Sequence, residues 1–328
     1  MNHPPIKATT GFYTDYQIAE GGYPLIAWCA LTLLLCLPGN TLILVASIKY
    51  KALKLDKVSI VLIENIAVAD LGMALFMVLP RMVSVIAARW EYACDVTAYA
   101  IFLFPGVSIL SVTALNISKL TCLLFPLRAR LRTHTQGRII GASLWACIVL
   151  VFALVQGILS ITESHNLGTS YDETLYMCNP YTSDVEPLYF IMIGFFTIPP
   201  ILVILVTTIW LMVYVQKVRG LSKESVVTLI AISLVFIVAF IPIGAKLIVG
   251  SIISSLIRLT IGHERTASAS ALFNWYRDDY THFAHSVPYL NCMANPIIYL
   301  FTVNSFKTFV VEMFRGWINS VRTGIRQN

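Results

Sequence analysis

The sequence predicts an all-α membrane protein: a seven-transmembrane helix bundle followed by a short amphipathic eighth helix. Two observations lead to this fold class. Of the 328 residues, 57% are hydrophobic and only 12% are charged, with a mean hydropathy of +0.76, which is more apolar surface than a soluble domain can bury. The apolar residues also gather into seven stretches that are long enough to cross a bilayer as helices.

The seven predicted spans divide the chain into three parts. The spans are Tyr23–Tyr50, Val58–Ala87, Ala93–Leu124, Ile139–Ile161, Leu188–Val215, Val226–Ile257 and Thr281–Thr302. Residues 1–22 then form an extracellular N-terminal segment, residues 23–302 the transmembrane domain, and residues 303–328 an amphipathic helix with a short cytoplasmic tail. Glycine and proline inside the spans are tolerable because neighbouring helices can satisfy the freed backbone groups.

Lysine and arginine gather in alternate connectors and in the tail, which sets the orientation of the chain. These basic residues are Lys49, Lys51, Lys54, Lys57, Arg128, Arg130, Arg132, Arg138, Lys217, Arg219, Lys223, Lys307, Arg315, Arg322 and Arg326. The connector over residues 162–187 is acidic and has neither lysine nor arginine. Because cytoplasmic loops carry the excess of basic residues, we expect a multi-pass protein of the plasma membrane with its N-terminus outside.

Two of the seven cysteines fall at the outer face in this topology. Cys94 opens the third span and Cys178 lies in the acidic outer loop, in a compartment that permits disulfides. We predict a bridge between them, and two unrelated thiols remain the alternative. The other five cysteines lie at membrane depth, where they are expected to act as small packing residues.

The residues after Tyr299 have a helical period with one apolar face. This face holds Phe306, Phe309, Val310, Met313, Phe314 and Trp317, and basic residues stand elsewhere on the same helix. The pattern predicts a helix that lies along the inner leaflet, with membrane lipid as its partner. The net charge of +6 does not point to nucleic acid, because no basic run is interleaved with exposed aromatic residues.

Asp70 stands in the middle of the second span, where an ionised carboxylate costs about 3 kcal/mol even on lenient insertion scales. Polar residues in other apolar spans are the candidates that offset this cost: Asn40, Ser108, Asn291 and Asn295. If they converge, the bundle has a buried polar core, which is typical of a membrane switch rather than of a passive anchor.

Ordered motifs now point to one family. They are Gly39-Asn40 in the first span, Asn65 to Asp70 in the second, Cys94 and Cys178, Trp145 in the fourth, Phe196-Thr197-Ile198-Pro199 in the fifth, Phe236, Phe240 and Pro242 in the sixth, and Asn295-Pro296-Ile297-Ile298-Tyr299 in the seventh. With these motifs in order, the chain resembles a rhodopsin-like (class A) G protein-coupled receptor along nearly its whole length.

The third span departs from this family at its inner end. The family usually carries Asp/Glu-Arg-Tyr there, and this chain has Ser118-Lys119-Leu120. Lysine keeps a cation but lacks the planar fork of arginine, and Glu224 is a candidate partner for Lys119. Thr207 or Thr208 takes the place of the fifth-helix tyrosine. The inner contacts are therefore expected to be unusual, with constitutive activity or weak coupling as consequences.

The resemblance implies a ligand-activated receptor that signals to heterotrimeric G proteins, with arrestin as a further partner. By the same resemblance, a sodium ion is expected at Asp70, Ser108, Asn291 and Asn295, and a hydrogen-bonded core without an ion is the alternative. No other cofactor is expected. The residues expected to act in the switch are Asn40, Lys119, Phe236, Phe240, Pro242, Pro296 and Tyr299.

The resemblance also suggests where a ligand binds. The pocket-facing candidates are Arg81, Ile101, Phe102, Lys246, His285 and Tyr289. Ile101 replaces the aspartate of amine receptors and Tyr289 the retinal lysine of opsins, so neither class fits. Arg81 and Lys246 favour a peptide carboxylate or another acidic ligand such as a fatty acid, unless they extend to the outer headgroups or pair with Asp95 or Asp278.

Three alternatives remain open at this point. A transporter would predict internal repeats or paired intramembrane charges, and the sequence shows neither. An enzyme is not predicted, because His282 and His285 lack a carboxylate in helical register deep in the same span. A non-coupling scavenger receptor of the same fold would account for the unusual Ser118-Lys119-Leu120.

Overall fold

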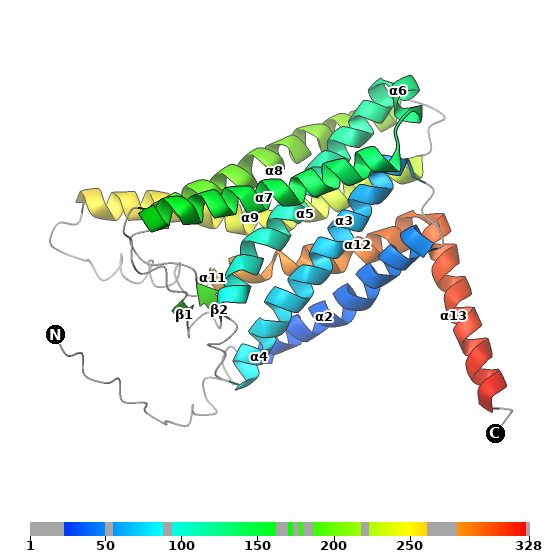
Figure 1. The fold of residues 1–328 in the computed structure, drawn as a ribbon, viewed down its shortest axis with the longest axis horizontal. Coiled ribbons are helices and arrows are strands. Elements are labelled where there is room, and N and C mark those ends of the chain that lie inside the picture. The colour runs from blue at the N-terminus through cyan, green and yellow to red at the C-terminus, as the bar shows by residue number, and fades with distance from the viewer. Residues whose placement is uncertain are drawn as a thin grey trace.

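The computed structural model describes residues 23–49, 55–87, 94–161, 170–172, 177–179, 186–217, 223–260 and 281–325. Nearly all of these residues are helical, and the long helices lie side by side in one elongated bundle (Figure 1). Among the described residues, six helices are long and apolar enough to cross a membrane, and a bent pair over residues 283–320 supplies a seventh. The predicted fold class is therefore confirmed.

The helices follow the predicted spans closely. The first span is α2 (Tyr23–Leu44) with the π-helical turn η2 (Val45–Lys49), and the second is α3 (Lys57–Met73), the π-helical turn η3 (Ala74–Val78) and α4 (Leu79–Ala87). The next elements are α5 (Cys94–Leu124), the short α6 (Pro126–Arg130), α7 (His134–Ile161), α8 (Glu186–Lys217) and α9 (Lys223–Thr260). The chain continues with α11 (Thr281–Ser286), α12 (Tyr289–Thr302) and α13 (Asn304–Ile325).

A short antiparallel pair of strands lies at one end of the bundle, near α4 and α11 (Figure 1). β1 (Ser170–Asp172) and β2 (Met177–Asn179) pair with Tyr171 opposite Cys178. β2 also lies against α5, the helix that begins at Cys94. The side chains of both cysteines lie outside the described residues, so the disulfide between them stays a prediction.

The seventh span differs from the prediction because it is broken. The sequence predicted one continuous helix over Thr281–Thr302, and the structure has a turn at Val287 and Pro288 between α11 and α12. Proline cannot donate to the preceding turn, and side chains from other helices bind the residue before the turn. Trp28 Nε1 donates to the Ser286 carbonyl at 3.1 Å, and Arg81 donates to the Ser286 hydroxyl at 3.1 Å.

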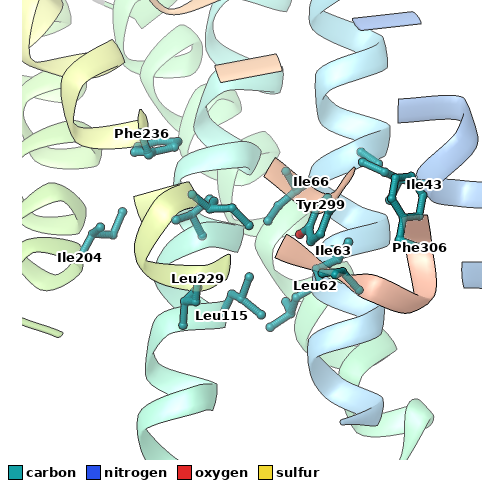
Figure 2. Packing of buried hydrophobic residues seen from close by; sticks show 14 of the residues in the cluster. Ile43, Leu62, Ile63, Ile66, Leu115, Ile204, Leu229, Phe236, Tyr299 and Phe306 are labelled. Atoms are coloured by element: carbon teal, nitrogen blue, oxygen red, sulfur yellow. The ribbon is translucent and has the colours of Figure 1, made fainter. Parts of the chain in front are cut away.

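The apolar core has an outer cluster, around Cys29, Met73 and Tyr289, and a larger inner cluster. In the inner cluster the ring of Tyr299 meets the ring of Phe306 edge-on, with centroids 6.3 Å apart (Figure 2). Both side chains are 2% exposed. The contact fastens α13 to the end of α12, at the sharp bend of 96° between the two helices.

The eighth helix is longer than predicted. One part of its apolar face is buried against the bundle and the other part is exposed. α13 has 22 residues rather than a few turns. Phe306 and Phe309 are buried against the bundle instead of facing the leaflet, whereas Phe314 and Trp317 are exposed. The apolar face is therefore divided between the protein core and the part expected to lie in lipid.

Helix α2 lies close against α12 at Gly39. A methyl group on Gly39 would lie 2.5 Å from Cγ and 2.6 Å from Cβ of Pro296. The proline ring is rigid, so it cannot move aside as a flexible side chain would. Gly39 is thus the residue that lets α2 lie against the Pro296 kink.

We predict that Gly39→Ala destabilises the protein, because overpacking costs about 1–3 kcal/mol. The apparent melting temperature of the purified full-length chain in detergent should fall. Gly244→Ala is the matched control, since no atom lies within 4 Å of the added methyl group and alanine is the better helix former. Equal melting temperatures for the Gly39 variant and the wild type would contradict the close approach.

Candidate functional site

Asp70 lies fully buried at the centre of the bundle, and polar side chains from α5 and α12 surround its carboxylate. Asn295 Nδ2 donates to Asp70 Oδ2 at 2.7 Å, and Ser108 Oγ and Asn291 Nδ2 each lie 3.5 Å from Oδ1. Asn291 Nδ2 also donates to Ser108 Oγ at 3.1 Å. The structure thus brings together the four residues that the sequence singled out for an ion.

Asn40 lies beside this cluster but plays a different part. Its Nδ2 donates to the Cys292 carbonyl at 3.0 Å and to the Cys36 carbonyl at 3.1 Å. Asn40 therefore ties α2 to α12, and no hydrogen bond between it and Asp70 is seen among the described residues. It supports the polar core from the side.

Several buried oxygens in the core have no hydrogen-bond partner among the described residues. They are the Oδ1 atoms of Asn40, Asn291 and Asn295. Unpaired buried acceptors are costly, and amide and carboxylate oxygens are the ligands that hard cations prefer. The donor set beside Asp70 therefore fits a small hard cation.

A cavity of about 90 Å³ opens on the outer side of the polar core. Its walls come from α5, α7, α8, α9 and α11: Ile101, Phe102, Pro105, Gly106, Ile109, Ile148, Val151, Phe152, Phe196, Thr197, Phe240, Ile243 and His285. Nearly all of these side chains are apolar. His285 stands at the polar end, with its Nε2 3.0 Å from Lys246 Nζ. The cavity can hold an apolar body and offers a basic pair to a polar group.

The six ligand-binding candidates do not form one surface. Ile101, Phe102 and His285 line the cavity, and Lys246 joins it through His285. Arg81 and Tyr289 instead lie together in the protein interior, with the guanidinium 3.5 Å from the Tyr289 hydroxyl and 5.9 Å from its ring centre. They are 2% and 1% exposed. Because Arg81 also binds Ser286, it supports the break in the seventh span. The side chains of Asp95 and Asp278 lie outside the described residues.

Two stacked phenylalanines connect the cavity with the inner core. The rings of Phe236 and Phe240 are 4.3 Å apart and nearly parallel. Phe240 lines the cavity, and Phe236 belongs to the inner cluster. Pro242 follows within the same helix, α9. A side-chain rearrangement at the cavity can therefore reach the inner half of α9 through one aromatic contact.

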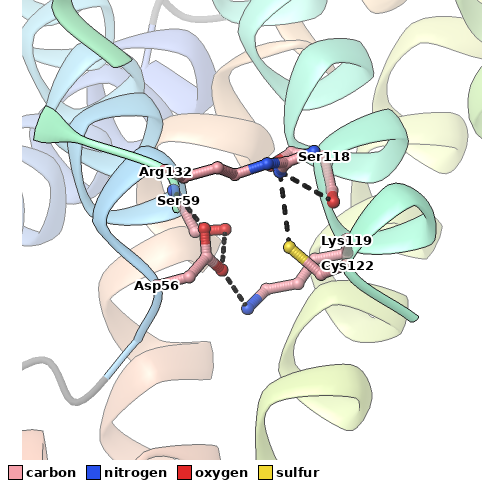
Figure 3. A network of polar contacts seen from close by, with 6 residues as sticks. All are labelled: Asp56, Ser59, Ser118, Lys119, Cys122 and Arg132. Atoms are coloured by element: carbon pink, nitrogen blue, oxygen red, sulfur yellow. Dashed lines mark hydrogen bonds and ion pairs between the residues drawn. The ribbon is translucent and has the colours of Figure 1, made fainter. Parts of the chain in front are cut away.

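At the inner end of the bundle, Lys119 pairs with Asp56 (Figure 3). Lys119 Nζ lies 2.7 Å from Asp56 Oδ2, and Ser59 donates both its hydroxyl and its backbone N–H to the same carboxylate. The side chain of Glu224, the candidate partner from the sequence, lies outside the described residues, so a contact between it and Lys119 stays a prediction. Asp56 is the N-cap of α3, a position that aspartate commonly occupies, and that was the only sequence signal for it.

The environment of Asp56 favours its charged form. Burial by itself would raise the pKa of this carboxyl. The charge of Lys119 and the hydrogen bonds from Lys119 and Ser59 outweigh burial and hold the pKa below its ordinary value. The ion pair is therefore intact at neutral pH.

Arg132 occupies the neighbouring part of this inner network (Figure 3). Its NH1 donates to Ser118 Oγ at 2.7 Å and to the Ser118 carbonyl at 3.2 Å, and it lies 3.3 Å from Cys122 Sγ. Arg132 follows α6 in the chain. The Ser118-Lys119 sequence thus binds a connector on one side and the start of α3 on the other.

Polar pairs between helices were the feature that sequence reasoning missed. Trp145 Nε1 donates to Asn65 Oδ1 at 2.7 Å, and Asn65 Nδ2 donates to Ser111 Oγ at 2.9 Å. Two further pairs, Asn116 with Ser233 and Thr228 with Thr302, join α9 to its neighbours. By contrast, Thr207 donates only within α8, to the carbonyls of Val203 and Ile204.

A bundle of membrane-crossing helices with a buried carboxylate, prolines inside its spans and an outer cavity defines a polytopic membrane protein. Comparison with known proteins agrees. The family model of the 7 transmembrane receptor (rhodopsin family) matches residues 39–299. The chain belongs to this family, which confirms the resemblance.

Individual relatives are distant. The human lysophosphatidic acid receptor 4 is 24% identical over 278 residues, which cover 79% of this chain and 70% of the relative. The human C-C chemokine receptor type 4 is 25% identical over 286 residues, 84% of this chain and 74% of the relative. The human neuropeptide FF receptor 1 is 24% identical over 182 residues, 53% of this chain and 41% of the relative.

Family membership settles the broad class of function. The protein is a multi-pass G protein-coupled receptor of the rhodopsin family, and this family consists of receptors rather than enzymes. Its relatives include receptors named for lipid and for peptide ligands. The class predicted from the sequence is therefore confirmed.

The Asp56–Lys119 pair predicts a specific pattern in a double-mutant cycle. Asp56→Asn and Lys119→Met should each lower the apparent melting temperature, and the double variant should lose less than the sum, with a coupling of about 1 kcal/mol. The pKa of Asp56 is depressed, so this stabilisation is complete above the ordinary aspartate value of about 3.9 and is lost only on acidification below it. Measurement at pH 7 therefore captures all of it. Strictly additive losses would rule out the pair.

Proposed function

We propose that this receptor recognises an amphiphilic acid: a molecule with an apolar body and one anionic group. The observation that carries the proposal is the apolar cavity with the basic pair His285 and Lys246 at its polar end. Pockets of this kind bind through apolar area and take their specificity from a few placed polar groups. The apolar body lies between α5, α7 and α8, and the anionic group faces Lys246.

Two relatives bear on the ligand class. One is named for lysophosphatidic acid and another for C-C chemokines. The lining of the cavity favours the lipid-like ligand, because Thr197 and His285 are the only described lining residues with polar side-chain atoms. A peptide that inserts a terminal carboxylate is the alternative, since the same basic pair would bind it.

The opposite end of the bundle has the surface expected of a transducer site. α6 and the residue after it expose Leu127 and Leu131, 77% and 78% exposed, next to Arg128 and Arg130. Exposed apolar side chains between cations suit a protein partner. We propose that heterotrimeric G proteins bind here and that arrestin competes for the same face. The protein then lies in the plasma membrane with its N-terminus outside.

The signal is proposed to pass along α9. A ligand beside Phe240 repacks the stacked Phe236, and the inner end of α9 then moves outward around the Pro242 kink. Pro296 in α12 provides a second flexible point, next to Tyr299 in the inner cluster. The polar core at Asp70 lies between these two kinked helices and senses their relative position.

Sodium is the ion that we propose for the polar core. Asp70 would supply the charge, and Ser108, Asn291 and Asn295 would supply neutral oxygens. A bound monovalent cation offsets the cost of an ionised carboxylate at this depth. A hydrogen-bonded core without an ion is the competing arrangement.

A second candidate function is a scavenger receptor that binds ligand without coupling. The observation that favours it is the engagement of Lys119 by Asp56, which turns this cation away from the inner surface. The two functions share the ligand site and differ only in signalling.

The ligand proposal predicts that removing one cation reduces binding of an anionic amphiphile. Cells expressing the chain would be screened with fatty acids, lysophospholipids, peptides and amines, using several G protein reporters. For the acid that responds, Lys246→Gln should weaken direct binding about tenfold or more, because a charge-assisted hydrogen bond contributes about 1.5–3 kcal/mol.

Lys57→Gln is the matched control, since Lys57 is an exposed lysine at the other end of the bundle. Binding should match the wild type in this variant. A responding ligand that is amine or uncharged, or one whose affinity is unchanged by Lys246→Gln, would contradict the proposal. Binding without any reporter response would favour the scavenger function.

The sodium proposal predicts a salt-specific stabilisation. The apparent melting temperature of the purified receptor should rise in sodium chloride relative to choline chloride at equal ionic strength, because an ion that binds only the folded state stabilises it. Asp70→Asn should abolish the difference. If both salts give the wild type the same melting temperature, the polar core contains no sodium site.

A further inference from the structure

The inner half of α9 is held against its neighbours by uncharged hydrogen bonds. Thr228 Oγ1 donates to Thr302 Oγ1 at 2.8 Å, and Thr302 in turn donates to the Ile298 carbonyl at 2.6 Å. Thr228 is 4% exposed. This chain of hydroxyls fastens α9 to the last turn of α12.

A second pair fastens α9 to α5. Asn116 Nδ2 donates to Ser233 Oγ at 2.9 Å, and the 3.2 Å between Ser233 Oγ and Asn116 Oδ1 provides the reciprocal contact. Both side chains are fully buried. Asn116 also donates to the Val112 carbonyl at 3.0 Å, which fixes its orientation on α5.

The nearby cations are engaged elsewhere. Lys119 on α5 pairs with Asp56 at the start of α3, and Arg132 binds Ser118. These charged contacts tie α5 to α3 and to a connector. The Asn116–Ser233 and Thr228–Thr302 pairs at the inner half of α9 are neutral.

The space next to these bonds is only partly filled. A small cavity of about 10 Å³ lies between α3, α5, α9 and α12, lined among others by Leu115, Lys119, Thr228, Ile232 and Tyr299. The Tyr299 hydroxyl is buried and has no hydrogen-bond partner among the described residues.

We propose that the Asn116–Ser233 and Thr228–Thr302 pairs, together named the α9 latch, set the resting position of the inner end of α9. The Asp56–Lys119 ion pair is not part of the latch. Among the described residues, the contacts of the inner end of α9 that opening breaks are these neutral hydrogen bonds. The inference rests on the outward movement of α9 in the proposed function.

The latch is weak enough to be adjusted by single substitutions. A hydrogen bond between transmembrane helices changes an equilibrium by about threefold on average. Removing one pair should therefore raise the ratio of open to closed α9 by about threefold, and removing both by about tenfold if the pairs act independently.

The test measures the position of α9 directly. Nitroxide labels would be placed on the purified full-length receptor at Val227 on α9 and Ile139 on α7, both exposed, through noncanonical amino acids that leave the native cysteines untouched. Double electron–electron resonance gives the distribution of distances. We expect Ser233→Ala and Thr228→Val each to enlarge the long-distance population, and Asp56→Asn to leave it at the wild-type level.

Matched controls distinguish the loss of a latch hydrogen bond from the loss of a hydroxyl group elsewhere in the bundle. Thr113→Val and Ser47→Ala remove hydroxyls that donate only to their own helical segments, at the carbonyls of Ile109 and Leu44, and should change nothing. Thr228→Ser keeps the hydroxyl and should restore the wild-type distribution. If Thr228→Val fails to fold, Ser233→Ala decides the outcome.

Two results would overturn the proposal: unchanged distances in the latch variants, or an equal opening in Asp56→Asn. The readout needs neither ligand nor G protein, so a receptor that fails to signal can still show the latch. In cells, the same variants should raise basal reporter activity at equal surface expression if the proposed coupling is correct. Failure of that second measurement alone would count against the coupling and not against the latch.

Discussion

The buried carboxylate of Asp70 is the constraint on which the arrangement of the bundle depends. A charge at mid-bilayer must find partners, because lipid offers none, and the partners stand on other helices. Ser108 from α5 and Asn291 and Asn295 from α12 therefore have to face α3 at one depth. Once these three helices are fixed, Asn40 holds α2 against α12. The relative positions of four helices thus follow from one charged group.

The sequence predicted most of this architecture for two physical reasons. A helix that crosses a bilayer needs a long apolar segment, so the spans can be recognised from the composition of the sequence. A carboxylate such as Asp70 stands out within such an apolar span. The break at Pro288 was not predictable in the same way, because proline is also tolerated in continuous transmembrane helices. It became evident only when Trp28 and Arg81 were seen at Ser286.

The candidate site was less predictable than the fold. Asp56 carries no signal as a partner of Lys119, because an acidic residue in a connector costs little wherever it lies. Asn116 carries no sequence signal for a partner, and its pairing with Ser233 depends on how α5 and α9 cross. Arg81 read as a pocket residue because cations at helix ends commonly face the outside, yet it lies in the interior at Ser286. Pairings between distant helices are set by three-dimensional packing, which a single sequence does not reveal.

The attachment of Ser286 has a mechanical consequence for the outer cavity. His285 lines that cavity, and the next residue is held from two sides, by α2 through Trp28 and by the second span through Arg81. These two hydrogen bonds hold this side of the cavity in place. The opposite side is carried by α9, a long helix with Pro242 inside it. In the proposed mechanism, a ligand that needs extra room displaces α9, so the size of the ligand as well as its charge would contribute to the movement.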